Sequence, residues 1–501
     1  MFVVTPVGLS SDEGITVHHA ARIFEGEVMY LDFFEFNGPM DAYAMALAFR
    51  LLGPSLLTVG LVGVLLASAT ATFSLLLASH LMPRTLAVLS TAFVVVSVFP
   101  GYAVADWHRW SVFYALPAVC GLLSTIGQPQ LVRFLGVGLL LGLQSMSVQS
   151  SAALMTLTAL GFCWLRPGTL RERCARLASL LFGLLLSVGT VVLWFGRQGA
   201  LDAMIYDRVV WVSTNYVPLG IEHFGSLLFW AVMTLVARDF EVRGEALLNL
   251  LFCLTTVWFA LAAVMECGVR ALFGLARTRT LSAEWFVALA TGAMLVSMFT
   301  AFDHSHVMHV APFWIPLVVS WAVHPRLATG ASPNRRARFL LGWLVVVFVA
   351  YAGYRFMGLA QSRYRLDFPR GSLRTGDRYQ AMQAQRLREF VERRTRRGDP
   401  IIVYPYAPYY YFLLDRKCPI RYSTLAPGYY TEAQIREALR DLERVAPRVF
   451  LHDTSTYAMI RDRWPTAGTD TDPVLRYLKR HYRSVGAFAG LELWERDRSG
   501  K

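Results

Sequence analysis

Long apolar runs are the feature of this 501-residue chain that most constrains its fold. A helix of about 20 mostly apolar residues can cross the hydrocarbon core of a bilayer. Only 17% of the residues are charged, against about 25% in soluble domains. The sequence therefore excludes a soluble globular protein and a disordered one, and it predicts a polytopic α-helical membrane protein with about 11 apolar spans. The expected spans are residues 54–79, 85–101, 110–126, 131–147, 151–165, 177–195, 223–237, 247–268, 284–302, 310–323 and 339–358.

The tail has a different character. Residues 359–501 contain 27 Lys and Arg against 17 Asp and Glu, which is +10 of the net charge of +13. In a membrane-anchored chain, this charge favours anionic lipid head groups or phosphorylated substrates over nucleic acid. Helix-like segments alternate with strand-like ones, so we expect a membrane domain over 1–358 and a small α/β domain over 359–501. The helix-like segments are 380–397, 431–445 and 472–481, and the strand-like ones are 401–404 and 449–451.

Arginine placement predicts how the chain is oriented. Clusters at 166–176 and 326–338 are expected on the cytoplasmic side by the positive-inside rule. The first loop (11–53), residues 105–110, residues 303–309 and the whole tail then lie outside. We therefore expect a multi-pass protein of the inner (plasma) membrane with an extracytoplasmic C-terminal domain. Counting single crossings conflicts with the basic residues near 270–279, so the number of crossings around 247–283 stays open.

Two adjacent carboxylates, Asp12 and Glu13, stand in the first outer loop. A carboxylate near an interface can gain basicity, which suits a general base that deprotonates an acceptor hydroxyl or amine. The alternative is that both residues only place negative charge at the N-terminus of a helix over Gly14–Phe24.

Polar groups also gather in two later outer loops. In Ala105–Trp110, His108 and Arg109 could hold a phosphate, or the two tryptophans could form part of an interfacial aromatic belt. Asp303–His309 contains three histidines and an aspartate. That loop could contact a phosphate or an acceptor, bind a divalent metal, or have no chemical role.

Weaker signals lie elsewhere in the chain. The long loop Gly196–Glu222, which contains Asp207 and Arg208, is mixed enough in composition to be a lid. The tyrosines of Tyr404–Tyr411 could stack on sugar faces, although a packed domain edge is the more common explanation. The six cysteines are dispersed and none has a CxxC spacing, so neither a disulfide framework nor a cysteine zinc site is indicated.

Two segments carry a family resemblance. The first has Asp12-Glu13-Gly14, Ala20-Ala21-Arg22-Ile23, Gly26, Tyr30, Asp32-Phe33-Phe34, Gly38-Pro39 and Phe49–Gly53, and the second is Tyr409–Tyr422. Together they resemble bacterial GT-C membrane glycosyltransferases of the family 39-like group, similar to protein O-mannosyltransferases and lipid A aminoarabinose transferases. Members of this family normally have a transmembrane helix before the acidic pair. Only 11 residues precede Asp12 here, so we expect the chain to be truncated, to begin late, or to lack that helix.

The resemblance implies a mechanism. A sugar moves from a polyprenyl-phosphate-linked donor to a cell-envelope acceptor (lipid, glycan or protein) with inversion, and the first-loop aspartate, Asp12, is the base. Asp32 matches the second acidic position of that loop. A divalent metal is allowed but not required, and no metal ligand is assigned. The expected substrate-binding residues are Glu13, Tyr30, Asp32, Asp106, His108, Arg109, Asp303, His304, His306 and His309.

Two other classes of function fit the sequence less well. A transporter or flippase of a lipid-linked glycan would be expected to show paired repeats and polar residues within its spans. The sequence shows no repeat, and its polar clusters lie in outer loops. A non-catalytic envelope scaffold would account for the tail but would leave Asp12, Asp32 and the histidine loop without a role.

Overall fold

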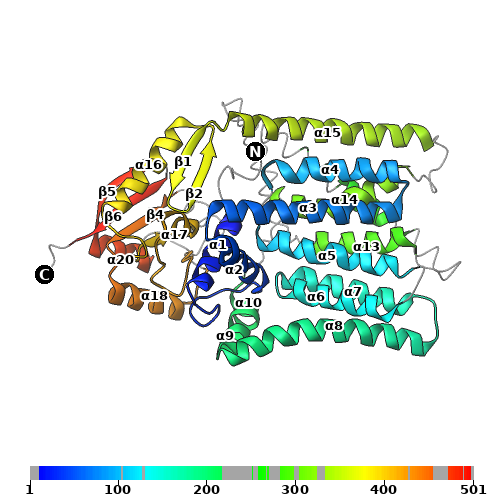
Figure 1. Cartoon of the computed structure of the whole chain (residues 1–501), viewed down its shortest axis with the longest axis horizontal. Coiled ribbons are helices and arrows are strands. Elements are labelled where there is room, and N and C mark those ends of the chain that lie inside the picture. Colours follow the sequence, from blue (N-terminus) through cyan, green and yellow to red (C-terminus); the bar gives the residue numbers. More distant parts are fainter. Residues whose placement is uncertain are drawn as a thin grey trace.

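The computed structural model describes most of the chain. Its helices lie side by side along the long axis of the molecule, and the strands form at one end (Figure 1). The described residues are 11–102, 105–126, 130–216, 251, 255, 258–266, 268–269, 282–297, 304–323, 333–426, 429–454, 472–488 and 490–497.

The helix bundle accounts for the apolar runs. Three of its described helices are long and apolar enough to cross a membrane: α3, α8 and residues 339–361 of α15. Shorter apolar helices lie beside them. The expected span at 223–237 falls outside the described residues, so the total of about 11 spans stays a prediction. The bundle helices are α3 (Leu56–Leu81), α4 (Arg84–Tyr102), α5 (Trp107–Ser124), α6 (Leu131–Ser145), α7 (Gln149–Leu165), α8 (Leu170–Arg197), α13 (Ala283–Ser297), α14 (His304–Val323) and α15 (Pro333–Gln361).

Two glycines allow helices α6 and α8 to pack closely. A Cβ on Gly138 of α6 would lie 2.0 Å from the Leu180 carbonyl oxygen of α8, and one on Gly183 would lie 2.2 Å from the Leu135 carbonyl oxygen. Small residues let helix backbones approach where lipid gives no hydrophobic driving force for association. The α6–α8 contact therefore depends on both glycines.

Short elements lie between the bundle and the strands. They are α1 (Ser11–Phe24), α2 (Met40–Leu52), α9 (Leu201–Ile205), the π-helix η2 (Tyr206–Trp211) and α10 (Val212–Asn215). In Figure 1, α1 and α2 stand at the junction of the helical and strand-containing parts.

The C-terminal part contains two sheets. A hairpin pairs β1 with β2, and a four-stranded sheet has the order β3-β4-β6-β5, with β3 and β4 parallel and the other pairs antiparallel. The expected helix at 431–445 occurs as α18, with the capping box between Thr431 and Gln434. The elements are β1 (Tyr364–Phe368), β2 (Gly371–Thr375), α16 (Arg378–Glu392), β3 (Ile402–Tyr404), α17 (Tyr409–Leu414), α18 (Glu432–Val445), β4 (Val449–Asp453), α20 (Pro473–His481), β5 (Tyr482–Phe488) and β6 (Leu491–Arg496).

The apolar packing crosses the boundary that the sequence predicts at residue 358, between the membrane domain and the C-terminal domain. One apolar core fills the helix bundle. A second core joins Val17 of α1 and Phe49 of α2 to Phe412 and Leu451 of the C-terminal part. The first outer loop and the C-terminal part thus form one packed unit on the end of the bundle.

Candidate active site

Three helix N-termini meet where the bundle contacts the C-terminal part. Asp12 and Glu13 occupy the first turn of α1, and Asp106 caps α5 by accepting a hydrogen bond from the Arg109 N–H. The Ala105 N–H donates to Glu13 Oε1 at 2.9 Å, which links α1 to α5. His309, in the second turn of α14, places Nε2 3.3 Å from Asp106 Oδ2. The structure therefore brings together residues from all three outer loops that the sequence singled out.

The histidines form a compact group around Asp106. The His108 ring lies 4.6 Å from that of His306 and 5.3 Å from that of His309, measured between centroids. Arg109 is fully buried beside them. Burial alone would raise the pKa of the Asp106 carboxyl, but His309 and the Arg109 N–H together hold it below its ordinary value. The group is therefore a buried carboxylate in contact with the His309 imidazole, and His108 and His306 lie next to that ring.

The two adjacent acids of α1 have different surroundings. Glu13 is buried, and that burial raises the pKa of its carboxyl to about 8, with the negative charge of Asp106 adding to the shift. Glu13 is therefore largely protonated at neutral pH and acts as an anchor for Ala105. Asp12 is only half-buried. Beside it, a Cβ on Gly14 would lie 2.7 Å from Tyr409 Cβ, so α17 packs directly on this turn.

A second polar group lies further along the first outer loop, and we call it the inner carboxylate group: Glu35, Asp41 and Asp207. All three residues are buried. His19 Nδ1 lies 3.1 Å from Glu35 Oε2, and Thr16 donates to Asp41 Oδ2 at 3.1 Å. Burial raises the pKa of Asp41 to about 7, and the charge of Glu35 adds to this shift.

Asp207 joins the inner carboxylate group from the π-helix η2. Its Oδ2 lies 3.6 Å from Arg421 Nη2 of the C-terminal part and 3.5 Å from the Glu35 N–H. Burial raises the pKa of Asp207 to about 7, although Arg421 opposes the shift. Arg208, the next residue, is also buried and donates to the Ser145 carbonyl at 2.7 Å. π-Helical turns are frequent at functional sites, and this one turns two adjacent charged residues inward.

Sequence reasoning missed Glu35, Asp41 and Arg421. Asp207 and Arg208 lay in the loop expected to be a lid, and the structure instead buries Asp207 against the first outer loop and Arg208 against the end of α6. A usable signal was present at residues 35–41, where two carboxylates flank the turn formers Asn37, Gly38 and Pro39.

Of the remaining predicted site residues, Tyr30 lies beside the inner carboxylate group, where its carbonyl accepts from Arg421 at 2.7 Å. Tyr30 is buried, and its hydroxyl donates to the Asn37 carbonyl at 2.8 Å. Asp32 is exposed, accepts from the Val28 N–H at 2.6 Å, and lines a charged groove of about 560 Å³ between the first outer loop and the C-terminal part. Asp303 is outside the described residues, as is the side chain of His304.

The tyrosine segment is packed rather than open. Tyr411 is buried, accepts from the Val403 N–H at 2.9 Å and stacks on His18 with 4.8 Å between centroids. Tyr404 donates to Asp472 in the interior of the C-terminal part. This segment is the packed edge that its composition also allowed.

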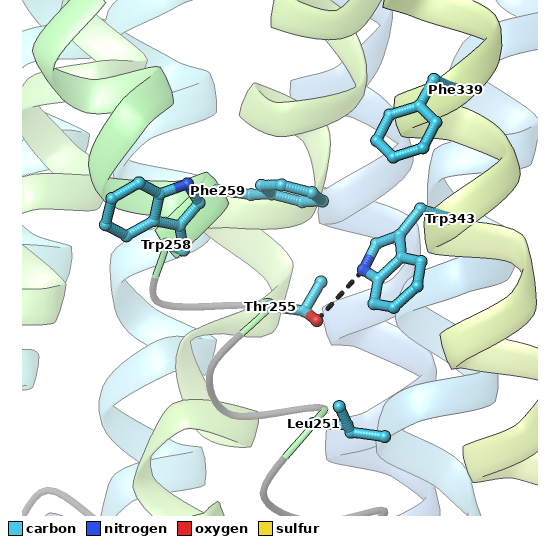
Figure 2. A pocket seen from close by; sticks show the side chains of 6 residues that line it. All are labelled: Leu251, Thr255, Trp258, Phe259, Phe339 and Trp343. Atoms are coloured by element: carbon cyan, nitrogen blue, oxygen red, sulfur yellow. Dashed lines mark hydrogen bonds between the residues drawn. The ribbon is translucent and has the colours of Figure 1, made fainter.

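An apolar groove of about 440 Å³ opens within the helix bundle (Figure 2). Its lining is apolar except for Thr255, which accepts from Trp343 Nε1 at 3.2 Å. The groove suits hydrocarbon rather than acid–base chemistry. Within the described residues no group of three or more His, Cys, Asp or Glu is arranged to hold a metal ion. The groove is lined by Leu251, Thr255, Trp258, Phe259, Phe339 and Trp343.

Comparisons with known proteins place the fold. Neither a protein-family model nor a curated protein sequence matches the chain. Among solved structures, ArnT from Cupriavidus metallidurans bound to undecaprenyl phosphate has a TM-score of 0.56 at 11% identity, over 99% of this chain and 95% of ArnT. The apo state of ArnT gives the same TM-score at 10% identity, over 98% and 94%. The archaeal oligosaccharyltransferase AglB from Archaeoglobus fulgidus, in complex with an inhibitory peptide and a dolichol-phosphate, has a TM-score of 0.49 at 11% identity, over 99% and 71%. The chain therefore has the fold of the GT-C membrane glycosyltransferases, as its sequence predicted.

Proposed function

We propose that this protein is a membrane glycosyltransferase that moves a sugar from a polyprenyl-phosphate-linked donor to a cell-envelope acceptor. The observation that carries the proposal is that the turn of α1 that carries Asp12 is joined, through Glu13, to the loop of Asp106, Arg109 and the histidines at one end of a GT-C bundle. The ArnT structure bound to undecaprenyl phosphate supports a polyprenyl carrier as the donor lipid.

The reaction assigns one task to each group. The acceptor hydroxyl or amine attacks the anomeric carbon of the donor while Asp12 takes its proton. The bond between the anomeric carbon and the phosphate oxygen breaks, and polyprenyl phosphate leaves with the electron pair. Attack opposite the leaving group inverts the anomeric centre. Arg109, His108, His306 and His309 stabilise the negative charge that develops on the phosphate.

Asp12 suits the role of base better than Glu13 does. Glu13 is buried, accepts from the Ala105 N–H and keeps its proton at neutral pH. Asp12, in the same turn, is half-buried and can be reached by a substrate. The two acids are therefore assigned to different tasks: proton acceptor and anchor of α5.

We assign the end of the bundle that carries Asp106 and Arg109 to the outer face of the inner membrane. The arginine clusters at 166–176 and 326–338 support a cytoplasmic position for the opposite end. A polyprenyl phosphate at the outer interface would present its charge at the level of Arg109.

The test uses the full chain reconstituted in liposomes. A panel of polyprenyl-phosphate sugars is supplied with envelope extract as acceptor, and released polyprenyl phosphate is measured. We expect release from at least one donor, with Asp12→Asn reducing it by about 10²-fold or more and Glu13→Gln serving as the matched control. If the protein neither binds undecaprenyl phosphate nor releases polyprenyl phosphate from any of the donors, the proposed function is rejected. Release that Asp12→Asn leaves intact would reject only the assignment of the base.

A further inference from the structure

The β1–β2 hairpin lies at the end of two candidate spans. β1 starts three residues after Gln361, the last residue of α15, and the hairpin lies beside the start of α3 (Figure 1). The Leu56 N–H, in the first turn of α3, donates to the Arg370 carbonyl at 2.8 Å. Because α3 and α15 are long and apolar enough to cross a membrane, their shared end marks the bilayer surface. The hairpin therefore stands at the level of the lipid head groups.

The two faces of the hairpin differ. Phe368 and Leu373 are buried and belong to the core of the C-terminal part. Arg365 and Arg374 are exposed and directly opposite each other in the antiparallel register. Like charges directly opposite each other destabilise a strand pair. The exposed face therefore gains stability from an anion that both guanidinium groups can share.

The chain supplies only part of that negative charge. Asp367 pairs with Arg365 at 2.5 Å, but both side chains are more than half exposed, where such a pair contributes little. Arg374 makes no ion pair with any described residue, and the same holds for Arg363 and Arg378, which are exposed nearby. Arg370, in the turn, is committed to Asp415 at 2.6 Å and fixes the hairpin to the C-terminal part.

Aromatic side chains accompany the arginines. Tyr364 is 40% exposed and Tyr379 is 61% exposed, and both lie at the open end of the hairpin, where Tyr364 pairs with Thr375 and Tyr379 follows four residues later. Tyrosine is enriched at membrane interfaces because its ring is apolar and its hydroxyl can stay hydrated. Two exposed tyrosines and four exposed arginines at the end of two spans form a surface suited to a phospholipid head group.

We propose that the exposed face of this hairpin binds the head groups of anionic phospholipids in the adjoining leaflet. The guanidinium groups of Arg365 and Arg374 hold the lipid phosphate through paired hydrogen bonds, and Arg363 and Arg378 add charge around it. The binding seats the C-terminal part on the membrane surface. It is independent of sugar transfer and of which side of the membrane the C-terminal part occupies.

The test titrates the full chain in neutral detergent with dioctanoyl phosphatidylglycerol, which is anionic, or with dioctanoyl phosphatidylcholine, which has no net charge. Each basic residue near an anionic lipid surface contributes about 1 kcal/mol, which is about fivefold in affinity. We expect Arg365→Ala with Arg374→Ala to weaken phosphatidylglycerol binding by about 25-fold, to weaken phosphatidylcholine binding less, and so to reduce the preference for the anionic lipid. If that double variant cannot be purified, Arg374→Gln alone should lose about fivefold.

Two controls separate this surface from other basic sites. Arg480→Ala with Arg483→Ala removes two exposed arginines from α20 and β5, at the far end of the C-terminal part (Figure 1), and should change the affinity by less than about twofold. Arg109→Ala should keep the preference for phosphatidylglycerol. Equal binding of the two lipids by the unchanged protein would overturn the proposal. An equal loss in the α20–β5 variant, or loss of the preference in Arg109→Ala, would also overturn it.

Discussion

Glu13→Gln separates the anchoring acid of α1 from the base beside it. The Glu13 carboxyl has an ordinary pKa of 4.5, which burial raises to about 8 in the folded protein. A raised pKa means that folding favours the protonated form, so the stability from this group is complete below pH 4.5 and is lost as the pH rises toward 8. Gln keeps the shape and the oxygen that accepts from Ala105 but has no proton to lose.

The magnitude follows from the same two values. At pH 7 the carboxyl is ionised in the unfolded chain and must take up a proton on folding, 2.5 pH units above its unfolded pKa. At 1.36 kcal/mol per unit, this lowers the free energy of unfolding by about 3 kcal/mol. Above pH 8 the cost levels off near about 5 kcal/mol. We therefore expect Glu13→Gln to be more stable than the unchanged protein at pH 7 to 9, and the two to converge near pH 5.

The assay is thermal unfolding of both proteins in the same detergent at a series of pH values from 5 to 9. Asp41 and Asp207 have raised pKa values as well, so both proteins lose stability with rising pH, and only the difference between the curves belongs to Glu13. Parallel curves would show that Glu13 is ionised in the folded protein. A transfer rate as low as that of Asp12→Asn would show that Glu13 is required for transfer as well as Asp12.

Three further changes test other parts of the structure. Arg109→Ala should weaken donor use strongly at every pH, and Arg109→Lys should restore it only in part, because an ammonium lacks the planar, two-pronged donor geometry of a guanidinium. If titration shows that Arg109→Ala leaves the donor affinity unchanged, the phosphate is bound elsewhere. A reporter active only in the periplasm, fused after Lys501, should be active, and activity of a cytoplasmic reporter instead would reverse the proposed orientation. Gly138→Leu should lower the thermal stability of the bundle by at least about 2 kcal/mol because its Cβ would lie 2.0 Å from the Leu180 carbonyl oxygen, whereas Gly136→Leu, with nothing within 4 Å, is the matched control.

Local patterns in the sequence predicted many elements well. Apolar runs marked the bundle helices, and the Thr431–Gln434 spacing marked the start of α18. Such signals depend on neighbours within a few residues, which the sequence displays directly. The close α6–α8 contact was not predicted, because glycines such as Gly138 and Gly183 occur along several of the apolar runs. Which small residues face another helix depends on the arrangement of the bundle.

The candidate site was predictable only where charges cluster in the sequence. The Asp106 and His306–His309 loops stood out, and the structure places them in contact. Asp32 was expected at the site from the family resemblance, yet it is exposed. The chain turns tightly there, with Tyr30 at a φ of 70° and a bridge between Met29 and Phe33, and the turn leaves Asp32 outside while it carries the following residues inward.

The contact of Glu35 with Asp207, and of Asp207 with Arg421, has no sequence signal of that kind. Glu35, Asp207 and Arg421 come from three segments spread over most of the chain, and each has few charged neighbours in sequence. They meet because the first outer loop and the C-terminal part share one apolar core, which aligns η2 between them. Asp207 is buried, so removing its partner Arg421 leaves an uncompensated buried charge, which is destabilising. The same contacts therefore also hold the C-terminal part over the turn of α1 that carries Asp12. The proposed base, Asp12, then has a defined position only when the C-terminal part is folded against α1.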